Sequence, residues 1–151
     1  MFYPNVANPP SFKYPANHLF RILGVVTAKR LANPDFYDEQ MNPAFIVAKN
    51  GQSTDLTFGR YSGLETYLCD KFDHESIEVA IYNFDKRSGD FSAKGDSGSL
   101  IFNAEGKMFA ILHSGMPRGL NSHVTFASPA HFIIEQLLTR YPHADFTRTT
   151  F

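Results

Sequence analysis

The chain has 151 residues, which is enough for one domain, or for one domain with an additional arm. Hydrophobic residues make up 43% of it and charged residues 19%, which excludes a globally disordered chain. The net charge is -1 without a long basic or acidic run, so neither nucleic acid nor an anionic membrane surface is favoured as a partner. A single cysteine, Cys69, excludes a disulfide-rich secreted scaffold.

The N-terminal third is predicted to be an irregular arm and linker over residues 1–43. Its first residues, MFYPNVANPPSFKYP, lack the basic and apolar stretches of a signal peptide, and their prolines favour extended or turn backbone. Leu19–Thr27 has the composition of a strand. No apolar stretch approaches the length of a transmembrane helix, so we expect no membrane partner and, by default, a cytoplasmic location.

From residue 44 onward, short β-rich runs alternate with turn signals. AFIVAKNG ends at the turn dipeptide Asn50-Gly51, and LTFGRYSG, LETYLC and the alternating SIEVAIYN follow it. GSLIFNAEGKMFAILHSG contains two apolar runs around residues 103–106, which predicts a hairpin, and HVTFASP is a further short strand. About six short strands between residues 44 and 128 favour a β-barrel or a sandwich.

The last predicted element is an amphipathic helix over Ala130–Tyr141. Its apolar residues recur at helical spacing. Ser128 is expected to cap it, with Pro129 in its first turn and Pro142 ending it.

The segment Gly95-Asp96-Ser97-Gly98-Ser99 carries the clearest chemical signal. A nucleophilic serine needs a tight bend that exposes its hydroxyl, and small neighbours permit that backbone. The amides of Gly95 and Ser97 can then converge on a developing oxyanion, where one donor is worth about 2.7–4 kcal/mol. The same residues also make ordinary turns, so a loop without function is the alternative interpretation.

Three segments, in order, resemble the second barrel of trypsin-like serine proteases of the chymotrypsin clan, in their fungal and bacterial type. Residues 48–59 resemble its opening, although Asp55 replaces a frequent glycine; residues 95–99 resemble its nucleophile loop, and residues 123–129 its closing strand. The resemblance implies an all-β fold, with a six-stranded antiparallel barrel and a C-terminal helix over residues 44–151. It also implies a serine endopeptidase that needs no metal or cofactor and acts on a peptide or protein substrate.

The other half of the catalytic machinery is not evident. In this clan the histidine and the aspartate come from a first barrel, and residues 1–43 are too few for six strands of about 5–6 residues with their turns. His18 and His74 precede Ser97 in unsuitable settings, and the remaining histidines follow it. We therefore expect little or no activity from the isolated chain, which is either a fragment or a degenerate, non-catalytic relative.

The resemblance also implies a substrate pocket. Phe91 takes its base position, which excludes a trypsin-type aspartate. In glutamyl-specific relatives, a strand histidine and a nearby hydroxyl hold the substrate carboxylate, so His113 and Ser92 predict an acidic preference. The alternative is that His113 is an ordinary strand residue. The other predicted wall residues are Ser114 and Gly115.

Two rival interpretations stay open. A non-catalytic module on the same barrel could bind a peptide along the strand edge near residues 113–116. An unrelated barrel could carry the GDSG turn by coincidence. A second barrel without its companion would also expose the apolar face that normally meets the first barrel, which would favour self-association.

Overall fold

The computed structural model describes residues 16, 20–34, 36–37, 41–69, 73, 75–116 and 123–146. Two helices, α1 (Ala28–Leu31) and α2 (Ala130–Arg140), lie before and after most of the β structure. The strands are β1 (Phe36–Tyr37), β2 (Pro43–Gly51), β3 (Asp55–Cys69), β4 (Glu75–Asn83), β5 (Leu100–Asn103), β6 (Met108–Met116) and β7 (Val124–Pro129).

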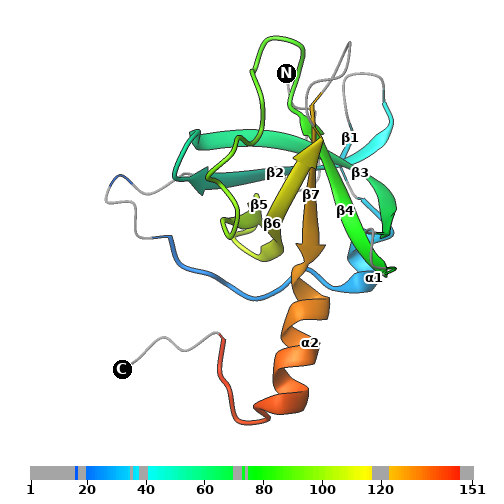
Figure 1. The fold of residues 1–151 in the computed structure, drawn as a ribbon, viewed down its shortest axis with the longest axis vertical. Helices are drawn as coiled ribbons and strands as arrows, with labels where there is room; N and C mark the ends of the chain where they lie inside the picture. The colour runs from blue at the N-terminus through cyan, green and yellow to red at the C-terminus, as the bar shows by residue number, and fades with distance from the viewer. Residues whose placement is uncertain are drawn as a thin grey trace.

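Strands β2 to β7 form a closed antiparallel barrel (Figure 1). Around the barrel their order is β2-β3-β4-β7-β6-β5, and β5 pairs back onto β2 with Val47 opposite Asn103. The short β1 adds to β2 outside this ring. The predicted fold class, a six-stranded antiparallel barrel followed by a helix, is confirmed.

The segment before the barrel differs from its prediction. Residues 20–27 do not form the predicted strand but only one isolated bridge, between Val25 and Met108. Val26 nevertheless donates its amide to the Met108 carbonyl at 2.9 Å, and Val26 and Leu31 are almost fully buried in the core. This part of the predicted arm is therefore built into the barrel. Residues 1–15, 17–19, 35 and 38–40 of the predicted arm lie outside the described residues.

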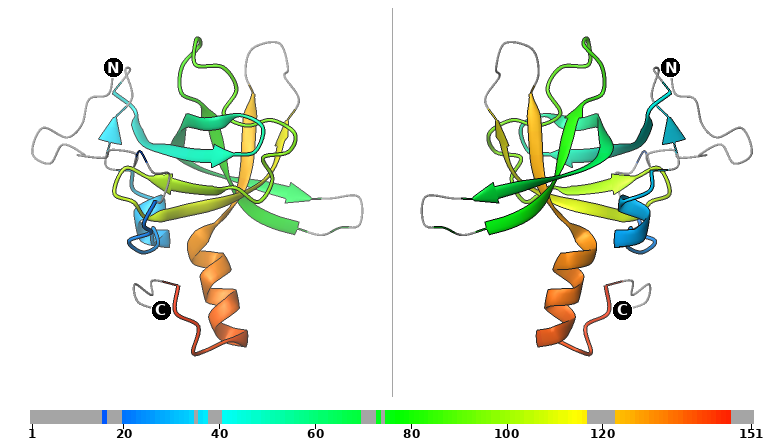
Figure 2. Two further views of the ribbon diagram at one scale, coloured as in Figure 1. Left: turned by 90° about the vertical axis from the view of Figure 1, so that its left-hand side faces the viewer. Right: turned by 90° about the vertical axis from the view of Figure 1, so that its right-hand side faces the viewer.

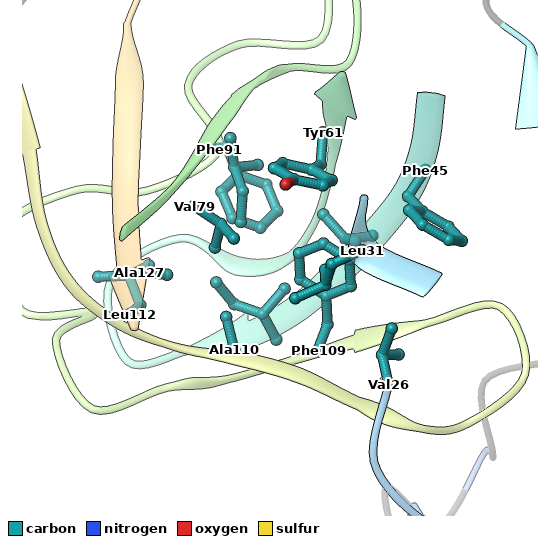
Figure 3. Close-up of a cluster of buried hydrophobic side chains, with 13 residues drawn as sticks. Val26, Leu31, Phe45, Tyr61, Val79, Phe91, Phe109, Ala110, Leu112 and Ala127 are labelled. Carbon is teal, nitrogen blue, oxygen red and sulfur yellow. The ribbon is translucent and has the colours of Figure 1, made fainter. Parts of the chain in front are cut away.

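Aromatic rings pack among aliphatic side chains in the core (Figure 3). Phe109 meets Phe45 and Tyr61 edge to face, with ring centroids 5.8 Å and 5.2 Å apart. Burial, followed by the charge of Glu65, raises the pKa of Tyr61 to about 12, so this phenol stays neutral. Edge-to-face ring contacts thus help to fill the centre of the barrel.

One long strand, β3, replaces the two short runs predicted from the sequence. It pairs with β4, and the register shifts between Tyr61 and Glu65. The ends of the two strands extend beyond the barrel as a hairpin (Figure 2). Leu64, Tyr67 and Ile77 are exposed there.

Helix α2 projects from the barrel, and of its residues only Ala130 is buried (Figure 1). The predicted capping role of Ser128 is wrong, because the helix starts after Pro129 without a side-chain cap. The Ser128 hydroxyl donates instead to the Glu78 carboxylate, at 3.2 Å. Neither described helix combines the length and apolar character needed to cross a bilayer.

Candidate active site

The loop that contains Ser97 begins near Phe91, whose backbone and side chain are both held in place by the barrel. The Phe91 amide donates to the side-chain oxygen of Asn83 at 2.9 Å, and the Thr57 hydroxyl donates to the Phe91 carbonyl at 2.7 Å. The Phe91 ring is buried in the core. The loop therefore leaves the barrel at a position fixed on both its backbone and its side chain.

Asp96 lies in the middle of this loop, and its side chain is fully buried. Its carboxylate lies 3.2 Å from the ammonium group of Lys49, which is also fully buried. Further donors come from the neighbouring turn and from the loop itself: the Ser53 amide at 2.7 Å, the Thr54 hydroxyl at 2.7 Å and the Ala93 amide at 3.0 Å. The Asp96 carboxylate is therefore paired with a local lysine and well supplied with hydrogen bonds.

These donors determine the charge of Asp96. Burial alone would raise its pKa, but the hydrogen bonds from Thr54, Ala93, Ser53 and Lys49 outweigh burial and hold the pKa well below its usual range. Asp96 is thus ionised at neutral pH and makes a buried ion pair between strand β2 and the loop.

Gly51 and Gly95 have no Cβ atom, which the close packing around Asp96 and Ser53 requires. A Cβ atom at Gly51 would lie 2.3 Å from the Asp96 carboxylate and 3.0 Å from the Lys49 ammonium. Gly95 has a φ of 106°, and a Cβ atom there would lie 2.3 Å from the Ser53 hydroxyl. The bend before Ser97 therefore favours glycine both for its backbone angle and for space.

Replacing Gly51 with alanine is expected to lower the free energy of unfolding by about 3 kcal/mol, because the new methyl group must displace a buried ion pair. Urea denaturation measures this loss. Gly89→Ala is the control, since Gly89 has a φ of 76° but no atom within 4 Å of a Cβ. That control carries only backbone strain of about 1 kcal/mol, and equal losses in the two variants would contradict the prediction.

Ser97 lies at the exposed tip of the bend. Its hydroxyl donates to the carbonyl of His113 at 3.2 Å, and the Gly98 amide donates to the Leu112 carbonyl at 2.7 Å. Both contacts fasten the loop to β6. Within the described part of the chain, neither the Gly95 amide nor the Ser97 amide donates a hydrogen bond to another group of the protein.

A pocket of about 360 Å³ opens beside Ser97. On one side, the Ser92 hydroxyl lies 2.7 Å from the Thr125 hydroxyl and 3.2 Å from Nε2 of His123. The lining residues are Ser92, Ala93, Lys94, Ser97, Leu112, Ser114, Gly115, Met116 and His123. Four residues that the sequence singled out, Ser92, Ser97, Ser114 and Gly115, thus come together here.

Two predicted pocket residues lie elsewhere. Phe91 belongs to the hydrophobic core, and the His113 ring is partly exposed and contacts the Glu78 carboxylate at 3.3 Å. Side chains alternate along a strand, so Leu112 faces the pocket and its neighbour does not. A register shift between Leu112 and Ser114 interrupts the regular pairing with β7 next to His113.

His123 was missed as a pocket residue. It directly precedes β7, and the pairing of Met116 with Val124 brings it beside the end of β6. The available signal was the hydroxyl of Thr125 two positions further along the chain, on the same side of the closing strand as His123. Only the observed register could show that both meet Ser92.

Among the described residues, no imidazole forms a hydrogen bond with the Ser97 hydroxyl. His18 and His74, the two histidines that precede Ser97, lie outside the described residues. In the part of the chain that the structure describes, no group of three or more His, Cys, Asp or Glu side chains is placed to hold a metal ion.

Strand β6 has a partly unpaired edge. Its first half pairs with β5 as far as Ile111, and β7 pairs along its other side as far as Met116. Beyond Leu112, which exchanges backbone hydrogen bonds with the Ser97 loop, the edge away from β7 meets no described strand. This free edge runs along the pocket.

No protein-family model matches the sequence, and no curated protein matches it. Among solved structures, the chain is similar to a chymotrypsin from Cellulomonas bogoriensis, with 16% sequence identity and a TM-score of 0.44. The alignment covers 65% of this chain and 47% of the chymotrypsin chain. The chain therefore spans about half the length of that structure.

Proposed function

We propose that the chain is a serine endopeptidase-like domain, with Ser97 as its nucleophile and the Gly95 and Ser97 amides as its oxyanion-binding donors. In this proposal the histidine and the acid that activate Ser97 come from outside the barrel. The domain alone therefore has little or no activity, and its substrates in a complete enzyme are peptides or proteins.

The loop geometry carries the proposal. An exposed serine hydroxyl lies at a bend that the buried pair of Asp96 and Lys49 holds in shape, and the same hydroxyl lines a pocket. The Gly95 and Ser97 amides have no acceptor among the described residues, so they are available to a developing negative charge. Such donors stabilise a transition state only when they are held in place beforehand, and the ion pair supplies that rigidity.

The contacts of Ser97 with other described residues support the proposal of an outside base. Its hydroxyl donates to a backbone carbonyl, which does not take a proton at neutral pH. The rings of His113 and His123 contact Glu78 and Ser92 instead. A serine without a base is a weak nucleophile, because its hydroxyl stays protonated.

A fluorophosphonate probe tests both parts of the proposal. We expect the isolated chain to be labelled slowly at neutral pH, and added imidazole to accelerate the labelling at Ser97. A positioned general base is worth roughly 10²–10⁴-fold in rate, and a free base recovers part of that factor. Intact-mass spectrometry follows the rate, and peptide mapping locates the adduct.

Two variants serve as controls for this labelling. Ser97→Ala should lose the imidazole-dependent adduct, whereas Ser88→Ala, at an exposed serine far along the loop from the pocket, should keep it. Rapid stoichiometric labelling without imidazole would show that a base is already in place. No adduct at Ser97 under any condition would remove its role as nucleophile.

The second candidate function is non-catalytic binding of a peptide along β6. The unpaired edge beyond Leu112 favours it, because an extended peptide can add to a free strand edge through backbone hydrogen bonds. Binding of a peptide by a chain whose Ser97 never reacts, even with imidazole, would support this function over the first.

A further inference from the structure

We infer that Ser53, in the turn between β2 and β3, is a positioning residue that holds the Gly95 amide in the orientation of an oxyanion donor. The inference rests on the proposed function, in which this amide is one of the two donors. Ser53 does not belong to the loop that contains Ser97, because it lies 41 residues before Lys94 in the sequence. It would therefore act on the site from a separate part of the barrel.

One hydrogen bond fixes the peptide unit that contains the Gly95 amide. The Ser53 hydroxyl donates to the carbonyl of Lys94 at 2.8 Å. That carbonyl and the Gly95 amide belong to the same planar peptide group, and none of the described peptide bonds is cis. In a trans peptide the C=O and the N–H point to opposite sides. The hydroxyl that holds the oxygen therefore directs the Gly95 N–H away from the turn.

The conformational freedom of Gly95 makes such a contact necessary. Its φ of 106° is accessible to glycine, but glycine can adopt the opposite orientation about as readily. Among the groups that the structure describes, the Ser53 hydroxyl is the one hydrogen-bond partner of the peptide unit between Lys94 and Gly95. Without this hydroxyl, the peptide unit could turn over and direct its carbonyl, in place of its amide, toward the oxyanion.

Ser53 is itself held firmly in place. Its amide donates to one oxygen of the Asp96 carboxylate at 2.7 Å, and the Thr54 hydroxyl donates to the other oxygen, also at 2.7 Å. This carboxylate is fully buried. A Cβ atom at Gly95 would lie 2.3 Å from the Ser53 hydroxyl oxygen, so the turn and the loop are in close contact here. The Ser53 hydroxyl thus extends the buried contacts of Asp96 to the peptide unit before Gly95.

Imidazole-assisted labelling of Ser97 by the fluorophosphonate measures the effect on the reaction. Ser53→Ala should slow the labelling about fivefold to tenfold, because the peptide unit loses one hydrogen bond between neutral groups. The loss should appear in the rate at saturating probe, and not in the probe concentration that gives half of this rate. Ser53→Thr keeps a hydroxyl and should keep the rate of the unchanged chain. Ser88→Ala is the matched control, because the Ser88 hydroxyl also donates to an exposed backbone carbonyl, that of Asp85, at 3.0 Å.

NMR couplings of Gly95 measure the orientation of its peptide unit without any probe. The couplings between a glycine amide proton and the two Hα protons depend on φ. In the unchanged chain they should match the φ of 106°, and in Ser53→Ala they should change, because the turned orientation has a different φ. Gly98 is the internal reference. Its amide donates to the Leu112 carbonyl at 2.7 Å, so its couplings should be the same in both chains.

The two measurements separate this inference from the proposed function. If Ser97 never reacts, even with imidazole, the proposed function fails, and the Gly95 couplings alone decide the role of Ser53. Unchanged Gly95 couplings in Ser53→Ala would overturn the inference, as would an unchanged rate of Ser97 labelling. A Ser53→Thr chain that reacts as slowly as Ser53→Ala would also overturn it, since the hydroxyl would then not be the group that acts.

Discussion

Replacing Lys49 with methionine is expected to lower the free energy of unfolding by about 3–5 kcal/mol, because it leaves the buried Asp96 carboxylate without its counter-ion. Both side chains of the pair are fully buried, so water cannot replace the lost ammonium group. Urea denaturation of the two proteins measures the difference. The loop around Ser97 should also lose its shape, which slows imidazole-assisted labelling of Ser97 in the same variant.

A surface pair provides the control. Lys107 lies 2.9 Å from Glu105, but both side chains are about one-third exposed, so Lys107→Met should cost no more than about 1 kcal/mol. The double variant Lys49→Met with Asp96→Asn should recover part of the loss, since no buried charge remains. A loss for Lys49→Met as small as that for Lys107→Met would show that the buried pair does not hold the loop.

The same pair predicts how stability depends on acid. The pKa of Asp96 is lower in the folded chain than its unfolded value of about 3.9, so its contribution is fully present above that value. The contribution is lost as the pH falls toward the lower pKa of the folded state. Asp96→Asn should therefore show less loss of stability than the natural chain when the pH is lowered below about 4.

Replacing Phe91 with alanine is expected to cost about 3–5 kcal/mol of stability, because its ring lies in the hydrophobic core. The ring also lies 5.7 Å below the ammonium group of Lys49. Its removal therefore leaves a cavity beneath the buried ion pair. Thermal unfolding and urea denaturation both report this loss.

Phe58→Ala is the matched control, since Phe58 is 41% exposed and its removal opens no core cavity. Equal losses in the Phe91→Ala and Phe58→Ala chains would contradict the prediction.

Periodicity and turn chemistry predicted most of the barrel strands and the C-terminal helix, although the single strand β3 was predicted as two runs. The alternation in SIEVAIYN gave β4, and the turn residues 103–106 gave the hairpin of β5 and β6. These signals are local, so each strand was recognised without knowledge of its partner. The bend at Ser97 was recognised in the same way, from small residues whose backbone freedom is an intrinsic property.

Features that depend on pairing between distant strands were not predicted. Leu112 lines the pocket, whereas the ring of the adjacent residue, His113, lies outside it. The sequence alone does not show how β6 is aligned with its neighbouring strands, and this alignment decides which side chains face the pocket. Likewise Lys49 and Asp96 meet only because β2 and the loop are adjacent in the closed barrel. The role of Val26 and Leu31 in the core was also missed, because neither irregular backbone nor a helix of only 4 residues shows a periodic pattern.

The closure of β5 onto β2 also has a consequence for how the chain folds. The residues that meet along this seam, such as Val47 and Asn103, are separated in the sequence by two other strands. Such non-local pairing raises the contact order, and proteins dominated by it fold in milliseconds to seconds rather than microseconds. During synthesis the seam stays open until β5 has left the ribosome, and until then the exposed edge of β2 is a template for pairing with other chains.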